Sequence, residues 1–179
     1  MNSNPMGIYI SRLAEAARMA CVENNLMQSN QCVLDENTVR AIVSFFDGKL
    51  EQVEDIVHSK TSGNIKCNSS MVKDTESSFT IKYVTYSSFD IMHELGHVFL
   101  DFNKMQVGEE RLTGDSDGGL GELGASRFAR AFLMPMQLFQ EKVVDCSTKG
   151  VCDIDCMAQT FDVDVTQVIC RGREVYSWE

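Results

Sequence analysis

The chain has 179 residues, of which 44% are hydrophobic and 23% charged, proportions that are typical of a folded globular protein and exclude wholesale disorder. Its 26 acidic and 16 basic residues give a net charge of -10, which disfavours direct binding to a nucleic-acid backbone and suits a basic protein partner. No apolar stretch approaches the about 20 residues that span a bilayer, so we expect no membrane association.

The N-terminal part predicts two amphipathic helices. Asn4 and Pro5 resemble a helix cap and first turn, and the apolar residues that follow are three or four positions apart: Met6, Ile10, Leu13, Ala17 and Cys21. Asp35 can cap the second helix and Gly48 is placed to end it, with an apolar stripe made of Val39, Ile42, Val43 and Phe46. We interpret both stripes as core faces.

Residues 48–86 predict a small antiparallel sheet. The segments "KLEQVEDI", "NIKCN" and "SFTIKYVTY" are short, rich in β-branched or aromatic residues, and separated by Gly, Asn and Ser. In the last segment Phe79, Ile81 and Tyr83 alternate with Thr80, Lys82 and Val84, as one buried strand face would.

The rest of the chain predicts helices around one loop. Ser87 or Ser88 can cap a helix over residues 88–102, and residues 108–121 form a loop because they are rich in glycine and charge. A helix begins near Leu120 and ends before Pro135, which can open the next helix. The tail predicts two short helices joined around residues 162–164.

The segment "HELGH" at residues 93–97 indicates a metal site. Positions i and i+4 share one face of a helix, so His93 and His97 can present imidazole nitrogens to one ion, and zinc accepts such ligands. Glu94 projects about 100° around the helix from His93, which suits a general base that takes the proton of a bound water. The alternative is a solvated helix that carries these residues by chance.

A catalytic zinc ion needs a third protein ligand, and the chain has no further histidine after His97. Glu122 is the best candidate, because small residues on its helix, Ala125, Ser126 and Ala129, allow two helices to approach closely. The competing carboxylates stand in the loop and would be poorly held. They are Glu109, Glu110, Asp115 and Asp117.

We therefore predict an α+β fold. We expect residues 1–179 to form a single zinc metallopeptidase domain. It comprises N-terminal helices at 1–47, a small antiparallel sheet at 48–86 and a metal-binding helical part at 87–179, whose zincin-like active-site helix carries HExxH. The tetrahedral intermediate of peptide hydrolysis needs one more hydrogen-bond donor besides zinc. His58, Tyr83 and Tyr86 are candidates, but their spacing in the sequence does not show whether they lie near the metal.

The seven cysteines show none of the close pairing of a secreted disulfide scaffold, and the N-terminus lacks the pattern of a signal peptide. We therefore expect a cytoplasmic protein with reduced thiols. Cys146, Cys152 and Cys156 match no zinc knuckle and are interpreted as core residues.

"HELGH", followed after a loop by Glu122-x-x-Ala125-Ser126-x-Phe128-Ala129 and then "FLMP", resembles the ImmA/IrrE family of zinc metallopeptidases. The resemblance extends from about the second helix to the C-terminus, where its closing segment includes Ala158, Phe161, Val163 and Arg171. It assigns His93, His97 and Glu122 as zinc ligands and Glu94 as the catalytic acid/base. The chain departs from the family at Ser126, where Asn is usual, and at Gly124, where an acidic residue is frequent. Ser126 lies one helical turn after Glu122, where its hydroxyl could hydrogen-bond a ligand histidine, and the alternative is a small residue for helix packing.

The resemblance implies a zinc endopeptidase that performs regulatory proteolysis on a specific protein, such as a basic helix-turn-helix repressor encoded beside it on a phage or mobile element. With no length to spare for its own DNA-binding domain, the chain is expected to be of the freestanding kind. The alternative function is a zinc-binding interaction or sensing module without significant peptidase activity. An intact Glu94 favours the enzyme, because a structural zinc site needs no base.

Overall fold

The computed structural model describes residues 5–60, 63–112 and 120–176 of the chain. They fall into two compact units, one formed by the segments Met1–Leu34 and Arg130–Glu179 and the other by Asp35–Ala129. Helices and small sheets occur together, so the predicted α+β class is confirmed. The single-domain organisation stays a prediction.

The unit Asp35–Ala129 contains a four-stranded sheet in the order β1-β5-β4-β6. Its strands are β1 (Gly48–Gln52), β4 (Ser69–Lys73), β5 (Phe79–Tyr83) and β6 (Glu110–Leu112). The predicted antiparallel pairing is confirmed for β5 with β4 and for β4 with β6. It is wrong for β1, which runs parallel to β5. The long connection between these two strands makes the parallel pairing feasible.

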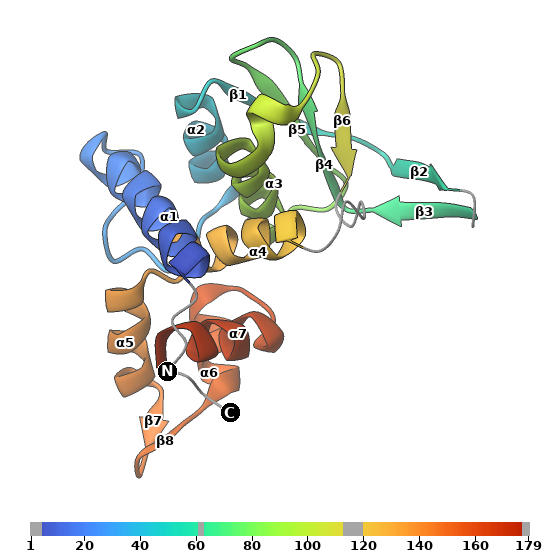
Figure 1. Ribbon diagram of the computed structural model, residues 1–179. Coiled ribbons are helices and arrows are strands. Elements are labelled where there is room, and N and C mark those ends of the chain that lie inside the picture. Colours follow the sequence, from blue (N-terminus) through green and yellow to red (C-terminus); the bar gives the residue numbers. More distant parts are fainter. Residues whose placement is uncertain (1–4, 61–62, 113–119, 177–179) are drawn as a thin grey trace. The chain divides into compact units, whose positions relative to one another are not determined.

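Part of that connection is a separate antiparallel hairpin of β2 (Ile56–Lys60) and β3 (Gly63–Cys67), which extends away from the four-stranded sheet in Figure 1. The predicted alternation of β5 is confirmed, because Phe79, Ile81 and Tyr83 are buried. The predicted loop at 108–121 is wrong at its start, where β6 forms, and its residues 113–119 lie outside the described residues.

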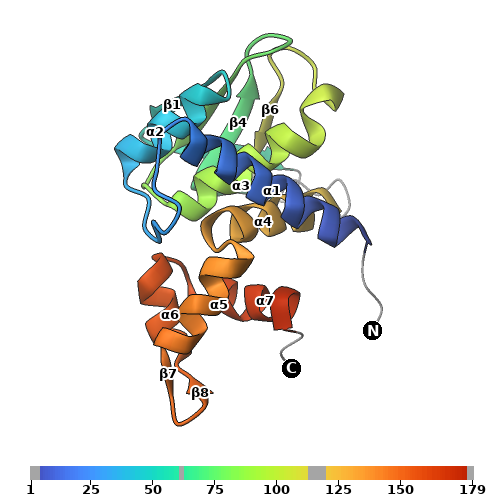
Figure 2. The same ribbon diagram turned by 90° about the vertical axis from the view of Figure 1, so that its left-hand side faces the viewer.

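Two helices of this unit, α2 (Glu36–Phe45) and α3 (Ser88–Asp101), lie on the same face of the sheet (Figures 1 and 2). The Asp35 side chain accepts a hydrogen bond from Thr38 N, and Ser87 accepts one from Asp90 N, so both predicted caps are present. A 3₁₀ turn at Phe102–Lys104 follows α3, and α4 (Leu120–Leu133) begins where the sequence predicted a helix.

The end of α2 differs from the prediction. Asp47, and not Gly48, adopts the left-handed conformation, with φ of 64°, and Gly48 already belongs to β1. Gly48 has a packing role instead, because a Cβ atom there would lie 2.4 Å from ring carbons of Phe79 and 2.8 Å from Val43 Cγ1. This glycine lets β1 and α2 approach the Phe79 ring.

The other unit contains α1 (Pro5–Glu23), the end of α4, and the helices α5 (Met136–Asp145), α6 (Ile154–Phe161) and α7 (Val165–Tyr176). Pro135 stands between α4 and α5 and Asp162–Asp164 between α6 and α7, as predicted. A short hairpin of β7 (Ser147–Thr148) and β8 (Val151–Cys152) was not predicted and precedes α6 (Figure 2).

On α1 the predicted stripe is confirmed for Ile10, Ala17 and Cys21, which are buried, but Met6 is 64% exposed. The predicted cap Asn4 lies outside the described residues. The buried face also includes Arg18, whose guanidinium donates to the carbonyl oxygens of Phe132 and Gln31. A cation therefore occupies a helix face that sequence periodicity treats as apolar.

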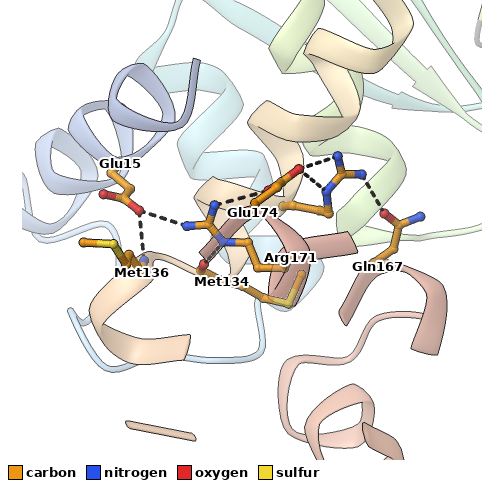
Figure 3. A network of polar contacts seen from close by, with 7 residues as sticks. Glu15, Met134, Met136, Gln167, Arg171 and Glu174 are labelled. Carbon is orange, nitrogen blue, oxygen red and sulfur yellow. Dashed lines mark hydrogen bonds and ion pairs between the residues drawn. The ribbon is translucent and has the colours of Figure 1, made fainter. Parts of the chain in front are cut away.

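A second buried guanidinium ties three parts of this unit together (Figure 3). Arg171 donates from Nε to Met134 O at 2.8 Å and from its terminal nitrogens to the carboxylates of Glu15 and Glu174. The Glu15 carboxylate also accepts from Met136 N at the start of α5, and Glu174 accepts from Arg130 at the end of α4. The network joins α1, α7 and the turn between α4 and α5. Its charges are all paired, which offsets the cost of burying them.

Cys146 and Cys156 form a disulfide bond that links the end of α5 to α6. The interpretation of these two residues as reduced core thiols is therefore wrong, because the β7–β8 hairpin returns the chain and brings them together. Cys152, within the same hairpin, is a free thiol. Disulfides are uncommon in a reducing cytoplasm, so cytoplasmic localisation stays a prediction. Among the described residues, no helix is long and apolar enough to cross a bilayer.

Replacement of Gly48 by alanine is expected to destabilise the protein by about 1–3 kcal/mol, since the added methyl group overpacks the contact with Phe79 and Val43. Urea denaturation followed by circular dichroism measures this change. Lys49→Ala, at the next and exposed position of β1, is the control and should change the unfolding free energy by less than about 0.5 kcal/mol. Equal stability of the two variants would contradict the packing role.

Candidate metal centre

The structure brings together the two histidines of α3 and one carboxylate of α4. His93 Nε2 lies 3.1 Å from His97 Nε2 and 3.1 Å from Glu122 Oε2. His97 Nε2 lies 3.1 Å from the other oxygen of the same carboxylate, Glu122 Oε1. Each side chain offers a ligand atom within 4.8 Å of those of the other two, so the three can reach a common point.

These separations fit a tetrahedral metal ion. Ligands at about 2.0–2.1 Å from zinc, with tetrahedral angles, are about 3.3 Å apart, close to the distances between the two imidazole nitrogens and the carboxylate. A neutral imidazole carries one N–H, and when that proton is on Nδ1, the two Nε2 atoms and the carboxylate would direct lone pairs at the same point. Two imidazole nitrogens and a carboxylate oxygen form a donor set that suits zinc.

The remaining ring nitrogens face supporting groups. His93 Nδ1 lies 3.1 Å from Ser126 Oγ. A ring that ligates through Nε2 carries its proton on Nδ1, and His93 would then donate this hydrogen bond to the Ser126 hydroxyl. His97 Nδ1 is buried and faces Asp101 Oδ2 at 3.7 Å, longer than a hydrogen bond. Asp101 also pairs with Lys104 at 2.6 Å and Arg111 at 3.4 Å.

Ser126 was predicted as a partner of a ligand histidine, whereas Asp101 was not predicted. Asp101 stands four positions after His97, one helical turn further along the same face, and this spacing is a signal that the sequence did contain. A carboxylate beside the distal nitrogen of a ligand histidine typically changes metal affinity by about 10–100-fold.

The centre is shielded from solvent on the side of α3. His93, Glu94 and His97 are at most 4% exposed, and the Glu122 side chain is 23% exposed. In the metal-free protein, burial by itself would raise the pKa of the Glu122 carboxyl, but hydrogen bonds from His93 and His97 outweigh it and hold this pKa well below its usual range. Glu122 is therefore ionised, as a metal ligand must be.

The two helices approach so closely because Gly96 lies between the histidines. A Cβ atom at Gly96 would be 2.9 Å from Ala125 Cα and 3.0 Å from Ala125 O, so the backbones are nearly in contact. Next to this point, the rings of Phe99 and Phe128 stack with centroids 5.0 Å apart. Small residues on both helices thus set the distance between the imidazoles and Glu122, as the sequence analysis expected from Ala125.

The competing carboxylates lie elsewhere. Glu110 is on β6 and accepts hydrogen bonds from Ser70 Oγ and Lys82 Nζ, while Glu109 accepts from Gln106 N. Asp115 and Asp117 lie outside the described residues. Glu122 is thus the carboxylate that joins the histidine pair in the part of the chain the structure describes.

The candidate donors for a reaction intermediate are not gathered at the centre by any described contact. The Tyr83 hydroxyl donates to Glu36 Oε1 at 2.6 Å, and the Tyr86 ring stands edge-on to Tyr83. His58 belongs to β2, and its side chain lies outside the described part of the structure. The Tyr83 hydroxyl is therefore engaged with Glu36.

Glu94 faces the sheet. Its carboxylate is fully buried, and Oε1 accepts a hydrogen bond of 2.8 Å from the hydroxyl of Ser69 on β4. Neighbouring residues of α3 therefore contact different elements. The histidines are directed towards α4, and Glu94 is in contact with β4.

Comparison with protein families matches residues 85–168 to the IrrE N-terminal-like domain, a peptidase family. This match supports the resemblance of residues 85–168 to the ImmA/IrrE family. The matched segment includes "HELGH" and Glu122 and is shorter than the resemblance noted in the sequence, which began near the second helix. The family assignment makes this part of the chain a metallopeptidase-type domain. Comparison with curated proteins finds no match to the chain.

Gly96→Ala is expected to weaken zinc binding at least about tenfold, because the methyl group would push α4 away from α3 and metal sites tolerate displacements of only about 0.5 Å. Competition with a chromophoric chelator measures the affinity. The control is Leu123→Ala, an exposed position on α4, which should bind zinc as the wild type does. Wild-type affinity in Gly96→Ala would show that the helix separation is not limiting.

Glu122→Ala should lower zinc affinity by more than the about 10–100-fold that loss of a supporting hydrogen bond costs, since it removes one of three ligands. Glu110→Ala removes a carboxylate that the sequence left as a competitor and should not alter zinc affinity. Elemental analysis after dialysis against a weak chelator gives the occupancy of both variants. Zinc retained by Glu122→Ala and lost by Glu110→Ala would transfer the ligand role to β6.

Proposed function

We propose that the chain is a zinc-dependent endopeptidase in which His93, His97 and Glu122 hold the ion and Glu94 is the catalytic acid/base. The observation that carries this proposal is the convergence of the three side chains: the two imidazole Nε2 atoms lie 3.1 Å apart, and each lies 3.1 Å from one oxygen of the Glu122 carboxylate, which suits a single tetrahedral ion. Three protein ligands leave one position for water, the arrangement of catalytic and not structural zinc sites. The family assignment supports the same reading.

When bound, zinc would lower the pKa of water from about 15.7 towards about 7 and polarise the substrate carbonyl. Glu94 takes the proton as the water oxygen attacks the peptide carbon, and then delivers it to the departing amine nitrogen, so the carboxylate is regenerated. Its burial excludes bulk water from the proton transfer. As ligands through Nε2, His93 and His97 would each carry their ring proton on Nδ1.

For the substrate we propose a specific protein, such as a basic helix-turn-helix repressor encoded beside the gene, in a regulatory system of phage or mobile-element type. The net charge of -10 supports a basic partner, because opposite charges increase the rate of encounter. The same negative charge disfavours the nucleic acid itself as a ligand. This charge argument predicts that cleavage slows as salt is added.

Glu94→Gln is expected to bind zinc with wild-type affinity and to lose cleavage by about a hundredfold or more, since the amide cannot accept the water proton. The assay follows cleavage of the repressor from the neighbouring gene, and of labelled casein, by gel electrophoresis with zinc content measured in parallel. Glu110→Gln, on β6, is the matched control and should cleave as the wild type does.

The outcomes separate the enzyme from a sensing module. Cleavage by the wild type with loss in Glu94→Gln supports the peptidase. Tight zinc binding without cleavage of any tested protein would instead favour a zinc-binding interaction module, and equal cleavage by Glu94→Gln would remove Glu94 from the mechanism.

A further inference from the structure

Ser69 is a buried polar residue beside the proposed active site. It is neither a proposed metal ligand nor a residue with a proposed direct contact to the substrate. It stands at the start of β4, is 1% exposed, and its hydroxyl lies 2.8 Å from Glu94 Oε1. We propose that Ser69 is a positioning residue that holds the Glu94 carboxylate in its working orientation. This inference rests on the proposed peptidase function, in which Glu94 handles the proton.

The position of Ser69 is fixed by the sheet. β4 pairs with β5 on one side, where Ser69 is opposite Tyr83, and with β6 on the other, where Ser70 is opposite Leu112. A serine hydroxyl is one rotatable bond from the backbone, so the strand determines where its oxygen lies to within a small range. Glutamate has three such bonds. The hydrogen bond therefore transfers the rigidity of the sheet to the end of a flexible side chain.

The bond also matters because of burial. Glu94 is fully buried, and a buried carboxylate is strongly destabilised unless donors replace the water that it has lost. The Ser69 hydroxyl supplies such a donor at Oε1, and a charge-assisted bond of this length is among the stronger protein hydrogen bonds.

The neighbouring residue provides a matched control. Ser70 is also on β4, is 0% exposed, and its hydroxyl also donates a bond of 2.8 Å to a glutamate. That glutamate is Glu110 on β6, because successive strand residues point to opposite faces of the sheet. Ser69 and Ser70 therefore share residue type, strand, burial and bond length but serve different carboxylates.

The direct test is a double-mutant cycle on the metal-free, full-length protein, with unfolding by urea as the readout. Ser69→Ala should raise the unfolding equilibrium constant about tenfold when Glu94 is present and less than threefold, roughly, in a Glu94→Ala background. Ser70→Ala should have the same effect in both backgrounds. An effect of Ser69→Ala that does not depend on Glu94 would overturn the proposal.

The second readout is kinetic and uses fluorescein-labelled casein with zinc supplied. Ser69→Ala should lower kcat about tenfold at unchanged KM and zinc affinity, Ser69→Thr should restore kcat because it keeps the hydroxyl, and Ser70→Ala should match the wild type. A wild-type kcat in Ser69→Ala, or lower zinc affinity in that variant, would overturn the positioning role. If the wild type cleaves nothing, the proposed function fails, and the cycle in the metal-free protein alone decides whether Ser69 orients Glu94.

Discussion

The near-contact of the α3 and α4 backbones at Gly96 and Ala125 is the constraint on which the candidate centre depends. Imidazole and carboxylate side chains are short, so they meet at a common point only if their helices are closer than ordinary side-chain packing allows. Gly96 provides that separation at the level of the histidines, one residue before His97. The proposed ligands determine which metal the centre could bind. The small residues Gly96 and Ala125 let the helices come close enough for the ligand atoms to reach one point.

The α3 helix therefore makes contacts on two of its sides. One side meets α4 through His93, Gly96 and His97, and the other meets the sheet through the bond between Glu94 and Ser69. A helix surrounded in this way cannot rotate about its axis without breaking both sets of contacts. The alternation of metal-facing and sheet-facing residues along one turn gives the proposed ligands and the proposed base fixed positions relative to each other.

Local features of the fold were predictable because they depend on neighbours in sequence. Asp35, Ser87 and Pro135 begin helices as expected, and the alternation from Phe79 to Tyr83 reveals a buried strand. Pairing between distant segments was not. The parallel register of β1, the assignment of Glu110 to β6 and the disulfide of Cys146 with Cys156 all depend on which segments meet in space. Ser69 was missed for the same reason, since its importance lies in the Glu94 carboxylate that it faces, whereas the spacing of Asp101, one helical turn after His97, was visible in the sequence.

The sequence separations between the candidate ligands are unequal. The histidines are four positions apart and are aligned by a single helix, whereas His93 and Glu122 are 29 positions apart. An ion held by all three would act as a cross-link that only the folded chain can accommodate, so its binding energy would be added to the free energy of folding. Above saturation, each tenfold rise in free zinc would then add about 1.4 kcal/mol to stability. The lifetime of such a protein in the cell would follow the supply of metal as well as its own packing.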